Sequence, residues 1–225
     1  LSFAITSTAT LAQVDRSHAP EAGPAPTIEL GESTMHKLAN GIQLIVVENH
    51  RLPKVSWTLS LEHKPIFEGN KAGMIDLFGD LMQSGTSLKS KAELDEAVDF
   101  IGASLSANAK GIRGSSLTKH TDEFLSLMAE VILSPSFPES EWERLRTQAL
   151  SGLLASESSP SAISDALTRT INFTNNHPYG EITTAETLGS ITREDFQDYH
   201  STYFHPNNAY LVVVGDIDSS IALEK

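Results

Sequence analysis

Two carboxylates spaced four positions apart lie within an otherwise apolar stretch, residues 72–83. Asp76 and Asp80 would share one face of a helix, because four positions are close to one helical turn. Such carboxylates repel each other slightly and offer only oxygen ligands, which suit magnesium or calcium better than zinc. Those ions need more oxygen ligands than the surrounding sequence supplies. The pair by itself therefore indicates no complete metal site.

The stretch that carries these carboxylates is expected to be an amphipathic helix. Its apolar side chains would form the buried side: Met74, Ile75, Leu77, Phe78, Leu81 and Met82. The opposite stripe would hold the positions that could do chemistry: Asp76, Gly79, Asp80 and Gln83. We therefore expect one open helical face at this point of the chain.

The composition excludes several other kinds of chemistry. The 225-residue chain has no cysteine, which rules out disulfide scaffolds, iron–sulfur centres and thiol nucleophiles. Its 29 acidic and 16 basic residues give a net charge of −13, so a nucleic-acid-binding face is not expected. The sequence contains no G-x-S-x-G elbow, no glycine-rich phosphate loop after a strand, and no apolar run of 18 residues that could span a membrane.

The elements that must position these residues can be predicted from periodicity. Asn40-Gly41 between apolar runs predicts a hairpin over 34–48, and a strict alternation predicts a strand over 55–62. Further strands are expected at 103–109, 112–119 and 209–215, and helices at 72–83, 90–101, 121–133, 139–157, 161–173, 184–189 and 192–202. Because neighbouring strands are joined by short turns, we expect an α+β domain with a largely antiparallel sheet and helices packed on one face.

The first 32 residues are expected to lie outside this domain. Residues 1–12 are small, apolar and hydroxylic, and they resemble the end of a secretory signal, which would place the protein in the periplasm or another exported location. Residues 13–32 are rich in proline and glycine and are expected to be a linker. The folded domain would span 33–218, and 219–225 would begin a link to a second domain.

Four stretches, in order, resemble one domain of the pitrilysin/insulinase family of zinc metallopeptidases, which includes mitochondrial processing peptidase. They are HKLANGIQLIVVEN, FEGNKAGMIDLFGDLMQSGT, LTKHTDEFLSLMAEVILSPSFPESEWERLR and HPYGEITTAETLGSITREDFQDYHSTYFHPNNAYLVVVGDI. The resemblance runs from about residue 35 to residue 217. It implies the family's metallopeptidase domain as the fold.

The family's zinc motif is degenerate in this chain. In H-x-x-E-H, two histidines bind zinc and the glutamate activates the metal-bound water. Aligned through Gly73 and Gly85-Thr86, the histidine positions fall on Asp76 and Asp80 and the glutamate position on Gly79. The resemblance therefore implies an inactive homologue with neither bound zinc nor catalytic residues.

The position of the family's third zinc ligand is ambiguous. Glu157 lies 77 positions after Asp80, close to the family's spacing, and is a weak candidate. Alignment on Ser159-Pro160 instead puts Ser151-Gly152 at the family's paired glutamates. The alternative for Glu157 is a solvated residue at a helix end.

One strand is a candidate for binding peptide without catalysis. In the family, the strand that corresponds to Leu105, Ser106, Ala107, Asn108 and Ala109 borders the cleft and pairs with an extended substrate. Main-chain pairing of this kind needs no catalytic side chain. The alternative is an ordinary strand of the sheet.

Together these features predict a non-catalytic subunit, or its N-terminal half, that forms one wall of a peptide-binding chamber. Its partners would be a homologous zinc-bearing subunit and an extended peptide, with zinc bound only in the catalytic partner. One alternative is a structural or binding relative of the same fold. Another is an active peptidase with an unusual metal site at Asp76 and Asp80.

Overall fold

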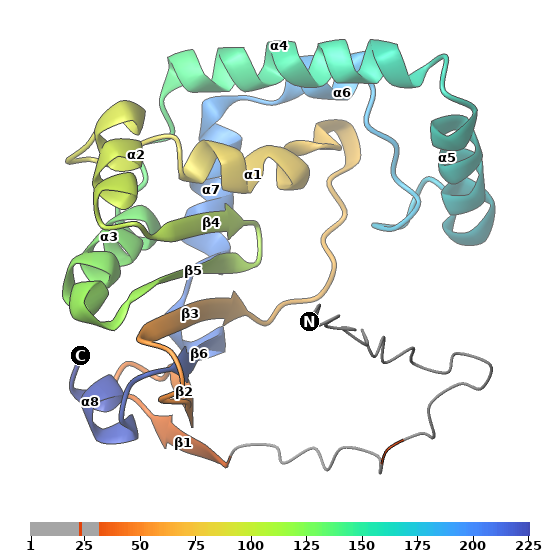
Figure 1. Ribbon diagram of the computed structural model, residues 1–225. Helices are drawn as coiled ribbons and strands as arrows, with labels where there is room; N and C mark the ends of the chain where they lie inside the picture. Colours follow the sequence, from red (N-terminus) through yellow and green to blue (C-terminus); the bar gives the residue numbers. More distant parts are fainter. Residues whose placement is uncertain (1–22, 24–31) are drawn as a thin grey trace, which may run out of the picture. The chain divides into compact units, whose positions relative to one another are not determined.

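The computed structural model describes Gly23 and residues 32–225, and its centre is one six-stranded sheet (Figure 1). The strands lie in the order β1-β2-β6-β3-β5-β4, and every neighbouring pair is antiparallel except β2 and β6, which are parallel. Their bounds are β1 Ser33–Lys37, β2 Gln43–Glu48, β3 Lys54–Leu61, β4 Ser104–Asn108, β5 Gly111–Leu117 and β6 Ala209–Gly215. The expected α+β class with a largely antiparallel sheet is confirmed.

Eight α-helices accompany the sheet in the described part of the chain. They are α1 Met74–Met82, α2 Lys91–Phe100, α3 Thr121–Leu133, α4 Glu139–Ser156, α5 Pro160–Phe173, α6 Ala185–Ser190, α7 Arg193–Tyr203 and α8 Ser219–Glu224. Seven of them lie where helical periodicity places them. Ser90 caps α2 through the backbone N–H of Glu93, whose side chain returns to Ser90, as the capping-box sequence predicts.

Helix α8 is the helix that the sequence does not predict. Residues 219–225 were expected to begin a link, but α8 folds back onto β2 and buries Ala222. The backbone N–H of Ser219 donates to Glu48 at 2.7 Å, which satisfies one free donor at the helix start. Asp218 at its N-cap makes no side-chain cap hydrogen bond, and the contact with β2 supplies the stability that so short a helix lacks by itself.

The insertion of β6 between β2 and β3 makes the sheet one unit. β1 and β2 form the expected hairpin around Asn40-Gly41, with Gly41 at a φ of 99°. β6, the last strand, pairs with β2 on one side and β3 on the other. Residues from both ends of the domain therefore meet at the centre of the sheet.

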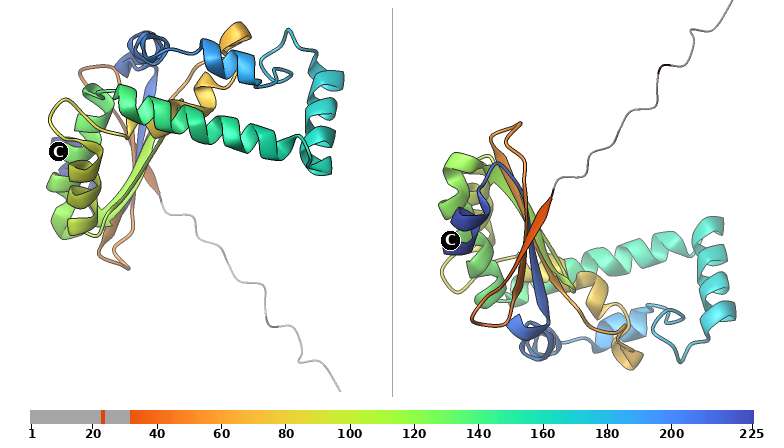
Figure 2. Two further views of the ribbon diagram at one scale, coloured as in Figure 1. Left: turned by 90° about the horizontal axis from the view of Figure 1, so that it is seen from above. Right: turned by 90° about the horizontal axis from the view of Figure 1, so that it is seen from below.

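One face of the sheet carries the core. Val55, Trp57, Leu59 and Leu61 of β3 are buried, whereas the intervening residues are half-buried or exposed. Helix α3 packs against this region through β5, where Gly114 leaves room for the ring of Phe124. Figure 2 shows α2 and α3 together on one side of the sheet, while α4 and α5 extend away from it.

Two predictions on the N-terminal residues lie outside the described part of the chain. These are the signal-like segment 1–12 and almost all of the linker 13–32. Within the described residues, no helix is both long enough and apolar enough to cross a membrane.

Candidate functional site around helix α1

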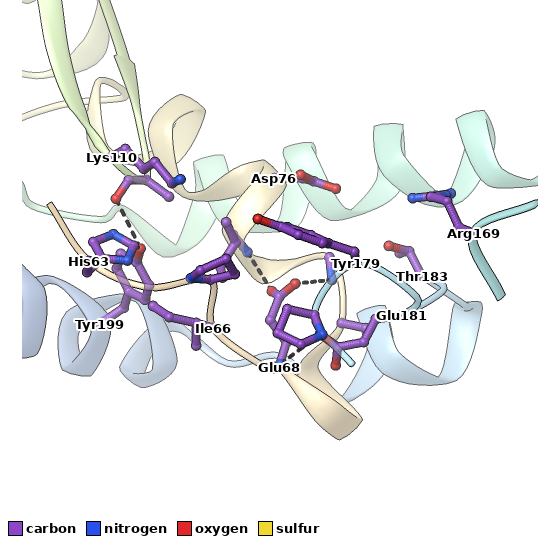
Figure 3. Close-up of a pocket in the computed structure, with 16 residues that line it drawn as sticks. His63, Ile66, Glu68, Asp76, Lys110, Arg169, Tyr179, Glu181, Thr183 and Tyr199 are labelled. Atoms are coloured by element: carbon purple, nitrogen blue, oxygen red, sulfur yellow. Dashed lines mark hydrogen bonds between the residues drawn. The ribbon is translucent and has the colours of Figure 1, made fainter. Parts of the chain in front are cut away.

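The N-terminus of α1 is held by a glutamate that precedes it. Glu68 accepts hydrogen bonds from the backbone N–H groups of Ile75, at 2.7 Å, and Gly73, at 3.4 Å (Figure 3). A carboxylate here satisfies free helical donors and is favoured by the helix dipole. Glu181 in turn accepts from the backbone N–H groups of Glu68 and Gly69. This pair of acidic residues positions the helix that carries the degenerate motif.

Burial raises the pKa of Glu68, and the nearby carboxylates of Asp76 and Glu181 add to the increase. The hydrogen bonds from Ile75 and Gly73 act in the opposite direction, because they favour the charged form. Since the backbone of α1 uses both carboxylate oxygens, Glu68 is a structural cap rather than a free base.

Asp76 lies exposed between two cavities. One, of about 270 Å³, is bordered by the segment before α1, the β4–β5 turn, and residues from α5 to α7. The other, of about 260 Å³, separates α1 from α4, where Ala149, Gly152 and Ser156 face it. Among the described residues, the carboxylate of Asp76 makes no hydrogen bond or ion pair. Asp76 is the aspartate that lines both cavities.

Gly79 is buried, and this corrects the expectation that it shares an open stripe with Asp76 and Asp80. A Cβ added at Gly79 would overlap the carbonyl oxygen of Ala107 and lie 2.5 Å from the Cα of Asn108. Helix α1 therefore contacts β4 through this glycine (Figure 1). The helical pattern does not reveal the contact, because it shows which residues share a face but not which strand approaches that face. A glutamate at this position has no room in the present packing.

Asp76 and Asp80 do not form the ligand set that the family's zinc requires. Asp80 is exposed and accepts a weak hydrogen bond from Gln83 at 3.4 Å. Within the described residues, neither aspartate belongs to a group of three potential ligands lying within 4.8 Å of one another. A zinc site needs at least three protein ligands with suitable geometry. The residues present at the motif therefore do not fit zinc.

Glu157 lies at the C-terminal cap of α4, exposed, and borders neither cavity beside Asp76. Gly152, which the other alignment puts at one of the family's paired glutamates, lines the cavity between α1 and α4. The alignment that puts Ser151-Gly152 at the family's paired glutamates stays a prediction. Under it, α4 offers no carboxylate to the motif.

The predicted peptide-binding strand is β4, at one edge of the sheet. It pairs with β5 alone among the described strands, and α1 lies beside it (Figure 1). Ser106 and Asn108 are exposed, Leu105 is half-buried, and Ala107 and Ala109 are buried. Gly79 covers the strand at Ala107 and Asn108, and α2 also contacts β4. Peptide binding by these residues stays a prediction.

The larger cavity brings together residues that the sequence did not connect. The hydroxyl of Tyr199 donates to the carbonyl of Ala109 at 3.0 Å and lies 3.3 Å from Nε2 of His63. Burial raises the pKa of Tyr199, so its hydroxyl stays protonated. Lys110 and Arg169 line the same cavity (Figure 3). No short-range pattern could have revealed this group, because its members come from four separate parts of the chain. These are α7, α5, the segment after β3 and the turn between β4 and β5.

The cavity has polar groups but no catalytic arrangement among the described residues. It mixes three carboxylates with two cations, and its acids are either caps, as Glu68 and Glu181 are, or isolated, as Asp76 is. Hydrolysis of a peptide needs an activated nucleophile, through either a metal-bound water or a side chain with an adjacent base. The cavity offers hydrogen-bonding and charged groups that could contact a polar chain.

A family model described as "Peptidase M16 inactive domain" matches residues 190–225, which include α7, β6 and α8. Two curated relatives match most of the chain. The uncharacterized zinc protease YmxG of Bacillus subtilis is 24% identical over 80% of this chain and 46% of its own length. The non-peptidase homolog YmxG of Helicobacter pylori is 23% identical over 82% of this chain and 44% of its own length. The chain thus spans about half the length of these relatives.

Solved structures show the same fold. The peptidase M16 inactive domain from Pseudomonas fluorescens superposes with a TM-score of 0.78 at 22% identity, over 86% of this chain and 48% of that chain. The periplasmic protease PqqL from Escherichia coli gives a TM-score of 0.69 at 17% identity, over 88% of this chain and 24% of that chain. The fold, the curated relatives and the family model together support membership of this chain in the pitrilysin-type M16 peptidase family.

Proposed function

We propose that this chain is a non-catalytic half of an M16 peptidase assembly and forms one wall of its peptide-binding chamber. A homologous subunit with an intact H-x-x-E-H motif would carry the zinc and perform the hydrolysis. This chain would bind no zinc at its own motif. Its role would be to hold an extended peptide in position.

The observation that carries the proposal is the packing of Gly79 on β4. The resemblance puts Gly79 at the position of the family's catalytic glutamate, and a side chain there would overlap backbone of Ala107 and Asn108, which supports a motif without a base. Yet the helix is still anchored by Glu68, beside an open cavity and an edge strand. A retained cleft without its chemistry favours binding over catalysis.

Edge pairing gives a physical basis for holding a peptide. A peptide added to the free edge of β4 would make main-chain hydrogen bonds that do not depend on its sequence. Holding a substrate in register is worth several kcal/mol of the reaction barrier, about 7 to 11 in well-oriented cases. A second wall can therefore raise the activity of a subunit whose own site is complete.

The assembly and the location are parts of the same proposal. The chain matches about half of its relatives' length, which fits one half of a two-part chamber. The signal-like residues 1–12 and the likeness to a periplasmic protease support an exported location.

The test combines the full protein with a purified zinc-bearing M16 subunit from the same source and follows cleavage of a fluorogenic peptide. Alone, the protein should cleave nothing and hold no stoichiometric zinc after dialysis. Mixed with the partner, it should raise the rate of cleavage. Co-elution without a rise would favour the structural relative, and one tightly bound zinc per chain would favour the active enzyme.

Peptide pairing with β4 can be tested separately. In an extended peptide, alternate N–H groups face the strand. Two peptides of one sequence, N-methylated at odd or at even positions, should therefore bind unequally, and a photoreactive version should label residues 104–109. Equal binding of both peptides would contradict edge pairing.

A further inference from the structure

A second concave surface lies on the domain between α2 and α3, which run side by side (Figure 1). This surface, the α2–α3 groove, has a volume of about 560 Å³. Its floor is apolar, built from Ala97, Ile101 and Leu127, and Phe100 stands at its rim with 88% of its surface exposed. The groove shares no lining residue with the two cavities beside Asp76.

The rim of the groove is acidic. Four carboxylates line it against one lysine and one histidine: Glu93, Glu96, Glu123 and Glu130 against Lys89 and His120. Lys89 pairs with Glu130 at 2.7 Å, and His120 contacts Glu123 at 2.9 Å. Within the part of the chain that the structure describes, Glu93 and Glu96 have no cationic partner.

Hydrogen bonds favour the charged form of two of these carboxylates, Glu93 and Glu130. Hydrogen bonds from the hydroxyl and backbone N–H of Ser90 lower the pKa of Glu93. Burial opposes the charge on Glu130, but hydrogen bonds from Lys89 and Thr86 outweigh it and leave the pKa of Glu130 below its ordinary value. An occupant of the groove therefore meets negative charge above an apolar floor.

We propose that the α2–α3 groove docks a cationic amphipathic helix of a partner protein. Its apolar side chains would pack on Phe100, Ala97 and Leu127, and its lysines or arginines would meet Glu93, Glu96 and Glu123. Helix-in-groove recognition uses this combination of an apolar stripe and flanking charge. The complementary charge selects a basic occupant, because an acidic or neutral helix would leave the carboxylates of the rim unpaired.

The dimensions of the groove suit a short helix. Helix α2 has 10 residues and is therefore about 15 Å long, so about three turns of a partner helix would span it. The exposed ring of Phe100 would be buried when a partner binds. It is the expected anchor, since aromatic side chains buried in an interface dominate its affinity.

The proposal is tested with a fluorescein-labelled 14-residue peptide of leucine and lysine, patterned as an amphipathic helix, in anisotropy titrations against the full protein. Two control peptides separate pattern from charge: one has glutamate in place of lysine, and one has the same composition with leucines spread around the helix. The amphipathic cationic peptide should bind, and both controls should bind at least about tenfold more weakly. Equal binding of the two cationic peptides would overturn the proposal.

Matched variants distinguish peptide binding in the groove from general attraction of a cationic peptide to an acidic protein. Phe100→Ser should weaken binding about tenfold, whereas Ile171→Ser, at another exposed apolar residue, should leave it unchanged. Glu96→Gln with Glu123→Gln should weaken it about threefold to fivefold at low salt. The control pair, Asp165→Asn with Asp198→Asn, removes the same charge from exposed positions elsewhere. Equal losses from the two pairs would mean non-specific attraction and would refute the groove.

A second copy of the chain is the competing occupant. Sedimentation of the full protein over a range of concentrations distinguishes it. A dimer that Phe100→Ser disrupts and Ile171→Ser preserves would overturn the proposal in favour of self-association.

Discussion

Helices α1 and α2 each carry a phenylalanine and a set of carboxylates, but the two helices use them differently. Phe78 of α1 is fully buried and contacts the rings of Phe137, Phe196 and Tyr199, whereas Phe100 of α2 is 88% exposed. The carboxylates of α1 belong to a helix that packs onto β4. Two carboxylates of α2, Glu93 and Glu96, line an open groove.

The two helices differ in whether their side chains are buried in the core or exposed at the surface. At the degenerate motif, the backbone of β4 fills the place of a catalytic side chain, so α1 is retained as a structural element of the cleft. At the α2–α3 groove, an apolar floor remains uncovered among the described residues. Helix α1 is thus part of the packing against β4, whereas α2 borders an uncovered apolar surface in the described part of the chain.

The largest expected effect distinguishes the two phenylalanines. Phe78→Ala should lower the free energy of unfolding by about 3 to 5 kcal/mol, because it leaves a cavity among four aromatic rings. Phe100→Ala should change it by less than about 0.5 kcal/mol, because its ring is exposed. Urea denaturation of both variants measures the difference, and a comparable loss in each would show that Phe100 is part of the core.

A second prediction compares two helical glycines. Gly79→Ala should destabilise the chain by about 1 to 3 kcal/mol or more, since its Cβ would overlap backbone atoms of β4. Gly152→Ala in α4 is the control. Its Cβ meets no atom within 4 Å, so the gain in helix propensity should stabilise the chain by up to about 1 kcal/mol. If thermal or urea unfolding shows that Gly79→Ala is neutral, α1 and β4 are not in close contact.

A third prediction concerns the recovery of a metal site. The exposed pair Asp76→His with Asp80→His should fold normally, with a change within about 0.5 kcal/mol, and bind zinc only weakly, because two histidines of one helix supply two ligands. Adding Gly79→Glu should unfold or strongly destabilise this variant rather than restore the site. Zinc titration against a competing dye, beside urea denaturation, measures both. Zinc that survives dialysis on the double variant would reveal a nearby third ligand.

The smallest expected effect is a pH dependence at the cap of α1. Burial raises the pKa of Glu68 above its ordinary value of 4.5, so the folded chain binds this proton more tightly than the unfolded chain. The stability that this group contributes is therefore greatest below pH 4.5 and is lost as the pH rises through the folded-state pKa.

Glu68→Gln removes this dependence. The difference in unfolding free energy between wild type and variant should decrease from pH 4 towards neutral pH, on top of a constant offset for the hydrogen bond lost from the cap. If the unfolding free energies of wild type and Glu68→Gln changed in parallel with pH, Glu68 would ionise in the folded chain as it does in the unfolded one.

Much of the fold could be predicted from local patterns. Alternation around Trp57, the turn at Asn40-Gly41 and the capping box at Ser90 and Glu93 each act over a few residues, and each appears in the structure where the pattern places it. The order of the strands was not predictable in this way. The parallel pairing of β6 with β2 joins residues more than 160 positions apart, and only the complete core determines it.

Some features of the candidate site could likewise be predicted from the sequence, and others could not. From the sequence, the resemblance to the family puts Asp76, Gly79 and Asp80 at the positions of a zinc motif, and helical spacing predicts that Asp76 and Asp80 share one face. Tertiary structure alone decided that Gly79 faces β4, that Glu68 caps α1 and that Tyr199 reaches Ala109. The physical reason is that a helical pattern defines a face, but the neighbour of that face depends on how distant strands and helices pack around a shared core.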